Sequence, residues 1–176
     1  TIIETMIAIS VFLVMVTIGM GSLLTANLIH GKSQDMRSIM DNLSFVMEDM
    51  ARSIRAGYEY YCISGGSTVN DCSNGEGITF RAYSGENWAY VINSQGQIRK
   101  STSGGVSGSF ITMTSPEIVM NSNSGFTVVG SLPPPGDTRQ PMITIRLVGS
   151  ITSKDSIVTP FSIQTSISGR LIDVEY

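Results

Sequence analysis

The first fifty-seven residues carry two hydrophobic patterns, one directly after the other. Residues Thr5 to Ile29 contain no formal charge. From Lys32 onward, apolar residues recur at alternating steps of four and three, which predicts the narrow stripe of an amphipathic helix: Met36, Met40, Leu43, Met47, Met50 and Ile54. Because no proline interrupts either pattern, we predict one continuous helix that reaches about Gly57.

The polar residues of the second pattern fall largely on the other side of this helix: Asp35, Arg37, Asp41, Asp49 and Arg52. This division is typical of a helix that packs on a sheet or on neighbouring helices. We therefore expect an apolar helical segment, 1–30, followed by an amphipathic segment, 31–57, that continues into a folded domain.

Beyond Gly57 the pattern changes to short runs of alternating apolar residues bounded by Gly, Asn, Ser and Pro, which predicts strands. Six are expected: Ile78 to Tyr83, Trp88 to Asn93, Gln97 to Ser101, Phe126 to Val129, Met142 to Val148 and Phe161 to Ile167. The predicted fold class is therefore α+β, a long N-terminal helix packed on an antiparallel β-rich head, 58–176.

Three connections carry turn signals. Asn93 to Gly96 predicts a hairpin turn in which Gly96 takes a positive φ. Pro133 to Gly136 is expected to be a stiff exposed connection, because three successive prolines fit neither a helix nor a central strand. The last two strands, joined through Ser153 to Ser156, are expected to pair in antiparallel fashion.

The charge-free run exceeds the ~20 residues that cross ~30 Å of hydrocarbon, so insertion in a bilayer is expected. The chain starts at Thr1 and has no basic stretch before the apolar run, so we expect that an upstream leader was removed, or that the chain was shortened. The net charge of −3, with 14% charged residues, gives no overall basic footprint for nucleic acid.

Cys62 and Cys72 are the only cysteines, and both fall in a segment that resembles a loop. If this part of the protein lies outside the cytoplasm, a disulfide is expected; two free thiols are the alternative. These cysteines and the distant His30 are too few for a four-ligand metal shell, and no cofactor is expected.

Three glycines interrupt the helical pattern: Gly19, Gly21 and Gly31. Each costs about 1 kcal/mol relative to alanine in an isolated helix, so they mark positions where the helix could thin or bend. In a membrane, small residues equally permit close approach of another helix.

The opening residues Thr1-Ile2-Ile3-Glu4-Thr5-Met6-Ile7-Ala8-Ile9 resemble the mature N-terminus of type IV pilins and type II secretion pseudopilins. In that family a prepilin peptidase cuts after a glycine, and the mature chain opens with a methylated Phe, then Thr-Leu-Ile-Glu and an apolar helix. Here the Phe is absent. Glu4 therefore aligns with the family's glutamate when one missing residue is counted before Thr1. Residues 42–55 resemble, more loosely, the J-type minor pseudopilins.

The resemblance implies a subunit of a helical filament on the cell surface, such as a pilus, which waits in the cytoplasmic membrane before assembly. Glu4 would neutralise the N-terminal ammonium of an adjacent subunit within the apolar core. The implied assembly residues are Thr1, Glu4, Ile7, Val11, Val14 and Ile18. The implied partners are further copies of the chain, the prepilin peptidase and the pilus assembly machinery.

Candidate chemistry is sparse. His30, the only histidine, lies at the end of the apolar run. No serine or cysteine lies in a motif that would make its side chain a nucleophile. Glu48 and Asp49 are adjacent on the predicted helix and point in different directions, so both are expected on a solvated face. We therefore do not expect this protein to be an enzyme.

Two sets of head residues are candidate binding surfaces. Arg81, Arg99 and Lys100 could contact nucleic acid, but three basic residues in an acidic chain usually belong to an ordinary surface. The aromatic residues could form a stacking or adhesion surface, yet alternate positions on a strand more often contribute to one face of the core: Tyr83, Trp88 and Tyr90.

The expected function is that of a structural filament subunit. A minor subunit that initiates a filament tip, or a pseudopilin of a secretion or DNA-uptake machine, would share the fold. From a different class, a membrane-anchored binding module that never polymerises is the other alternative.

Overall fold

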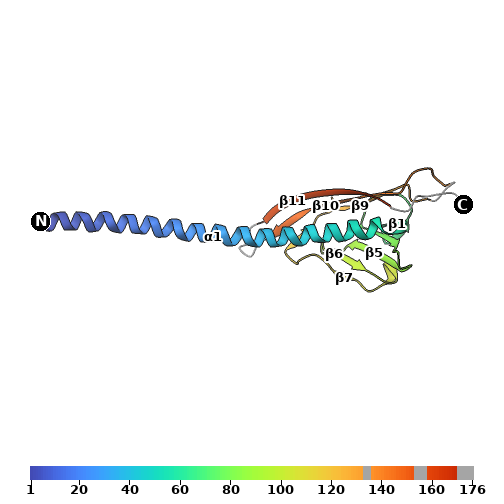
Figure 1. The fold of residues 1–176 in the computed structure, drawn as a ribbon, viewed down its shortest axis with the longest axis horizontal. Coiled ribbons are helices and arrows are strands. Elements are labelled where there is room, and N and C mark those ends of the chain that lie inside the picture. Colours follow the sequence, from blue (N-terminus) through green and yellow to red (C-terminus); the bar gives the residue numbers. More distant parts are fainter. Residues whose placement is uncertain (133–135, 153–157, 170–176) are drawn as a thin grey trace. The chain divides into compact units, whose positions relative to one another are not determined.

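The computed structural model describes residues 1–132, 136–152 and 158–169, in two units, Thr1–Ser38 and Ile39–Tyr176. One helix, α1 (Ile2–Arg55), forms the first unit and supplies the first element of the second (Figure 1). The continuous helix predicted from the sequence is therefore confirmed. The division of the chain into 1–30, 31–57 and 58–176 stays a prediction.

The end of α1 is held by groups from the next strand. The Tyr60 hydroxyl lies 2.8 Å from the Ile54 carbonyl oxygen, which also accepts from the Gly57 N–H, and 2.5 Å from the Gly57 carbonyl oxygen, so its one proton can be donated to either acceptor. A Cβ on Gly57 would lie 2.4 Å from a ring carbon of Phe80. The chain can therefore leave the helix this close to the sheet only with glycine at this position.

Strands follow α1 throughout the described part of the second unit, with one short 3₁₀ turn, η1 (Gly105–Ser107). Their bounds are β1 (Tyr58–Ser64), β2 (Ser67–Val69), β3 (Cys72–Gly75), β4 (Gly77–Arg81), β5 (Asn87–Ile92), β6 (Ile98–Ser101), β7 (Ile111–Thr112), β8 (Ile118–Met120), β9 (Gly125–Val129), β10 (Met142–Thr152) and β11 (Val158–Ser168).

The strands form two sheets, and every strand pair in the described residues is antiparallel. The first sheet has the order β2-β1-β4-β5-β6-β7. The second has the order β11-β10-β9-β3, with β8 also paired to β10. In Figure 1, β9 to β11 and β5 to β7 are drawn on opposite sides of the part of α1 that belongs to the second unit, from Ile39 to Arg55. The predicted α+β class is confirmed.

All six predicted strands are present, as β4, β5, β6, β9, β10 and β11. The last two are longer than predicted and pair in antiparallel register from Met142↔Ser168 to Thr152↔Val158, as expected. The hairpin turn is also confirmed, because the Gly96 N–H donates to the Asn93 carbonyl at 2.9 Å and Gly96 has a φ of 71°. Residues 133–135 of the proline connection and Ser153 to Ser156 lie outside the described residues.

Five short strands were not predicted: β1, β2, β3, β7 and β8. The expectation that both cysteines lie in a loop was therefore wrong, since Cys62 belongs to β1 and Cys72 to β3. Strand β2 has only three residues, and β3 consists of Cys, Ser, Asn and Gly, of which Asn and Gly disfavour extended structure on their own. Pairing with neighbouring strands, which a local pattern does not reveal, places them in the sheets.

Within the second unit, α1 buries a stripe formed by Ile39, Leu43, Val46, Met50 and Ile54. The predicted stripe agrees at Leu43, Met50 and Ile54 but was wrong at Met40, which is 36% exposed, and it missed Ile39 and Val46. Strict steps of four and three have a period of 3.5 residues, whereas a straight helix has 3.6. This difference amounts to only about 20° per heptad, which does not explain the missed Val46 between the correctly predicted Leu43 and Met50. The buried stripe is instead turned to one side of the predicted one, away from Met40.

Asp49 joins this helix to the first sheet. Its Oδ2 atom accepts hydrogen bonds from the Lys100 ammonium and the Tyr90 hydroxyl, each at 2.8 Å. Lys100 also lies 4.6 Å from the centre of the Trp88 ring. Burial, reinforced by Asp49, raises the pKa of Tyr90 despite an opposing hydrogen bond with Ser53, so its hydroxyl remains a donor. The expectation that Asp49 faces solvent was wrong, because a helix position beside the stripe can still reach the sheet.

Replacement of Asp49 by alanine is expected to lower the free energy of unfolding by about 1–3 kcal/mol, because it leaves the Tyr90 and Lys100 donors without their partner. Glu48→Ala provides the matched control. Among the described residues Glu48 pairs with Arg52 alone, and both side chains are more than two-thirds exposed, so the loss should stay below about 0.5 kcal/mol. Chemical denaturation of the full chain in mild detergent measures both values; equal losses would contradict this assignment.

Candidate functional site

The apolar helix surface of the first unit is the principal candidate site. Ile2–His30 has 29 residues, and its most apolar 18-residue stretch has a mean hydropathy of 2.4 and no buried residue. At ~1.5 Å per residue it is about 43 Å long, compared with ~30 Å of hydrocarbon. The segment is therefore long and apolar enough to cross a membrane, a property that it shares with N-terminal signal sequences.

Hydroxyl groups within this segment hydrogen-bond to their own helix. Thr5 donates to the Ile2 carbonyl at 2.9 Å, and Ser10 donates to that of Ile7 at 2.8 Å. Thr17 and Thr25 reach carbonyl oxygens three or four residues earlier in the same way. Because an unpaired hydroxyl is costly in an apolar medium, these bonds suit a helix that is covered by lipid or by other helices.

The expected assembly face, Ile7, Val11, Val14 and Ile18, forms one stripe at helical spacing, and each side chain is 51–66% exposed. Comparable exposure occurs on the other sides of α1, for example 66% at Phe12 and 70% at Met15. Apolar surface therefore surrounds this segment. The assignment of one stripe to assembly stays a prediction.

Glu4 is the only Asp, Glu, Lys or Arg in the first thirty residues. Its Oε2 atom lies 3.3 Å from the Thr1 amino nitrogen of the same chain, and both side chains are more than 80% exposed. The carboxylate also stands in the first turn of α1, where the helix dipole favours negative charge. Such an exposed pair contributes little in water, so both groups are open to other partners. Pairing of Glu4 with a neighbouring subunit stays a prediction.

The helix runs without a break through Gly19, Gly21 and Gly31. A Cβ on Gly19 or Gly21 would meet no atom within 4 Å, so nothing inside the chain requires glycine there. Small residues do allow another helix to approach closely. Bending at these positions and close helix approach both stay predictions.

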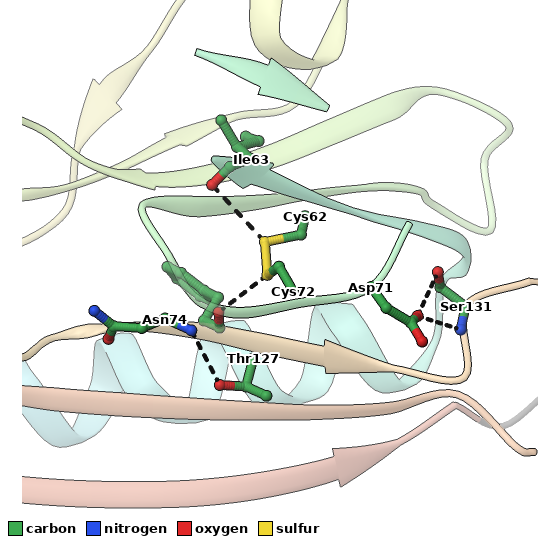
Figure 2. The surroundings of a disulfide bond; sticks show 8 residues. Cys62, Ile63, Asp71, Cys72, Asn74, Thr127 and Ser131 are labelled. Carbon is green, nitrogen blue, oxygen red and sulfur yellow. Dashed lines mark hydrogen bonds between the residues drawn. A yellow bond between two sulfur atoms is a disulfide. The ribbon is translucent and has the colours of Figure 1, made fainter. Parts of the chain in front are cut away.

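A disulfide between Cys62 and Cys72 joins the two sheets, as Figure 2 shows. Cys62 lies on β1 in the first sheet and Cys72 on β3 in the second, with their Cα atoms 6.1 Å apart. The predicted disulfide is confirmed. A Cβ on Gly75 would lie 2.2 Å from the Cys62 sulfur and 2.8 Å from the Ile63 carbonyl oxygen, so glycine makes room for the bridge.

Polar contacts hold the chain on both sides of Cys72 (Figure 2). One carboxylate oxygen of Asp71 accepts hydrogen bonds from the N–H and the hydroxyl of Ser131, both at 3.0 Å. The other oxygen accepts from the Gly130 N–H at 3.2 Å. Partial burial raises the pKa of Asp71, but these hydrogen bonds, helped by Arg139, outweigh that effect and hold it below its usual range.

The three basic residues that are candidate contacts for nucleic acid each have a partner in the chain. Arg81 pairs with Glu59 at 3.5 Å, and Lys100 pairs with Asp49. Arg99 lies 5.4 Å from the centre of the Phe110 ring and donates to the Phe110 carbonyl. Their positive charges are therefore already engaged within the second unit.

The three aromatic residues occupy different environments. Tyr90 is buried in the core and stacks on Phe80, while Trp88 is half-buried. Tyr83 is 92% exposed and lies beyond the end of β4 at Arg81, so its expected place in a strand was wrong. Glu86 and Asn87 continue the chain after a turn at Gly85, with a φ of 85°, which explains why the strand stops early.

Within the described residues, no group of three or more His, Cys, Asp or Glu side chains could hold a metal ion. His30 is exposed at the end of the apolar segment. Comparisons with protein families, with curated proteins and with solved structures found no significant match.

Removal of the disulfide by Cys62→Ala with Cys72→Ala is expected to lower the free energy of unfolding by about 2–3 kcal/mol, because the bridge closes a loop of about ten residues in the unfolded chain. Denaturant titration of the full chain measures the change. Dithiothreitol should cause the same loss in the wild type and none in the double variant. If dithiothreitol left the free energy of unfolding of the wild type unchanged, the result would contradict the expectation.

Asp71→Asn is expected to lower the free energy of unfolding by about 0.5–1 kcal/mol near pH 7. Because the folded-state pKa of Asp71 lies below its unfolded value, the wild-type advantage is present above about pH 4 and is lost as the pH falls through the folded pKa. Denaturation of both chains across this range measures the difference. An advantage that persists in acid would show that Asp71 acts through something other than its charge.

Proposed function

We propose that the chain is the structural subunit of a cell-surface filament, a type IV pilus or a related pseudopilus, and that it assembles through the apolar surface of α1. The observation that carries this proposal is the apolar helix Ile2–His30, unburied within the chain and with Glu4 as its only charged side chain. The resemblance of residues 1–9 to pilin N-termini supports the same assignment.

Burial supplies the driving force. An apolar side chain gains about 1.5–3 kcal/mol when it is fully removed from water, and the large side chains of this segment are mostly more than half exposed. Lipid can cover them before assembly, and neighbouring copies of α1 can cover them afterwards. Transfer from lipid to a helix bundle exchanges one apolar environment for another, so packing and polar pairing must favour the bundle.

Glu4 provides that pairing in the proposal. Its carboxylate and the amino group of another copy would compensate each other in an apolar core, whereas either charge alone would be strongly destabilising. The pair would also favour one register of subunit addition. The motor, the platform and the peptidase would be separate proteins.

The disulfide fits this location, because such bridges persist in oxidising compartments outside the cytoplasm. The second unit would then be the part of the subunit that meets the surroundings of the cell. A membrane-anchored module that never polymerises, and a minor subunit present in few copies, are distinguished from the main proposal by the experiment below.

Glu4→Ala is expected to reduce surface filaments at least about tenfold, because an unpaired charge would remain in the apolar core. Electron microscopy counts the filaments, and immunoblots of membrane fractions confirm that the subunit is present. Glu86→Ala, which removes an exposed carboxylate from the second unit, should leave filament numbers unchanged.

Normal filaments in the Glu4→Ala strain would contradict the role of Glu4. Absence of this chain from every filament of the wild type would favour the anchored module. Labelling confined to filament tips would instead favour a minor subunit.

A further inference from the structure

A polar hollow of about 390 Å³ lies on the outer face of the second sheet. Its volume falls within the ~300–1,000 Å³ that ligand sites in proteins occupy. The lining comes from β3, β9, β10, β11 and the segment before β9, and includes Asn74, Asn123, Thr127, Thr144, Arg146 and Gln164. Every one of these side chains can form hydrogen bonds, and no carboxylate of the described residues lines the hollow.

Arg146 is the one charged residue among the described residues that line the hollow. It is exposed on β10, between Gly125 of β9 and Gln164 of β11 in register. Among the residues that the structure describes, none forms a hydrogen bond or an ion pair with its guanidinium. By contrast, Arg81 and Lys100 pair with carboxylates of their own chain.

The space beside Arg146 is set by Gly125 and Asn74. Directly paired residues of antiparallel strands point to the same face, so the missing side chain at Gly125 leaves room next to the guanidinium. A Cβ there would lie 2.6 Å from Oδ1 of Asn74, whose backbone has a φ of 58°. The Asn74 N–H donates to Oγ1 of Thr127 at 3.3 Å, and its side-chain amide donates to the Ser122 carbonyl at 3.4 Å. These bonds fix the wall of the hollow.

We propose that this hollow binds an acidic saccharide, with the Arg146 guanidinium on the sugar carboxylate and the surrounding amides and hydroxyls on the sugar hydroxyl groups. A guanidinium presents two parallel N–H donors that match a carboxylate. The neutral lining pairs with hydroxyl groups and adds no further positive charge. A polyphosphate such as nucleic acid is disfavoured, because its binding depends on several cations and this chain has a net charge of −3. The inference does not rest on filament assembly.

The test is calorimetric titration of the full chain in nonionic detergent with a tetramer of glucuronic acid, and with a glucose tetramer of the same linkage. The acidic tetramer is expected to bind saturably with a Kd of roughly 1 mM or below, and the neutral one at least about tenfold more weakly. Arg146→Gln should weaken the acidic tetramer at least about tenfold, and Gln164→Ala should weaken both tetramers.

Arg55→Gln is the matched control, because it removes the same charge from an exposed position at the end of α1, and its affinity should stay within about twofold of wild type. Absence of saturable binding by the wild type would overturn the proposal, and so would equal affinities of Arg146→Gln and wild type. Tighter binding of a thymidine dodecamer than of the acidic tetramer would overturn the choice of a saccharide.

Discussion

The apolar surface of α1 over residues 2–30 is the constraint on which the rest of the chain depends. Water solvates such a surface poorly, and four of its hydroxyls, those of Thr5, Ser10, Thr17 and Thr25, donate to carbonyls of the same helix. Lipid tails and other copies of the helix are also apolar, so either can shield this surface from water. Glu4 is the one charged side chain that either apolar environment must accommodate. It lies in the first turn of α1, where the helix dipole favours negative charge.

The second unit solves a different problem, because it must bury a modest core between two sheets and a single helix. The stripe from Ile39 to Ile54 supplies the apolar contact, and Asp49 ties the helix to the first sheet through Tyr90 and Lys100. The disulfide then links the first sheet to the second, and Asp71 secures the chain next to it. Covalent and polar links thus supplement the apolar core of the second unit. The polar hollow around Arg146 lies on the outer face of the second sheet, away from this core.

Sequence patterns revealed the long helix and the strands with strong apolar alternation, since both depend on local periodicity. They missed β1 although its tyrosines and isoleucine favour a strand, and they missed β3, where pairing across the chain outweighs the weak preferences of Asn and Gly. They also placed Asp49 in solvent, because a partner forty-one residues away in the chain leaves no local signal. The cysteine pair was predictable from its spacing and expected compartment, but its role as a link between sheets required the topology.

The central claim is that copies of α1 cover one another. A photoreactive amino acid placed at Val14 of the full chain in its native membrane, followed by irradiation and mass spectrometry of the adducts, tests it most directly. The account predicts adducts between Val14 and residues 1–30 of a second copy. Adducts to lipid alone, here and at Ile7, Val11 and Ile18, in cells that display filaments would contradict it.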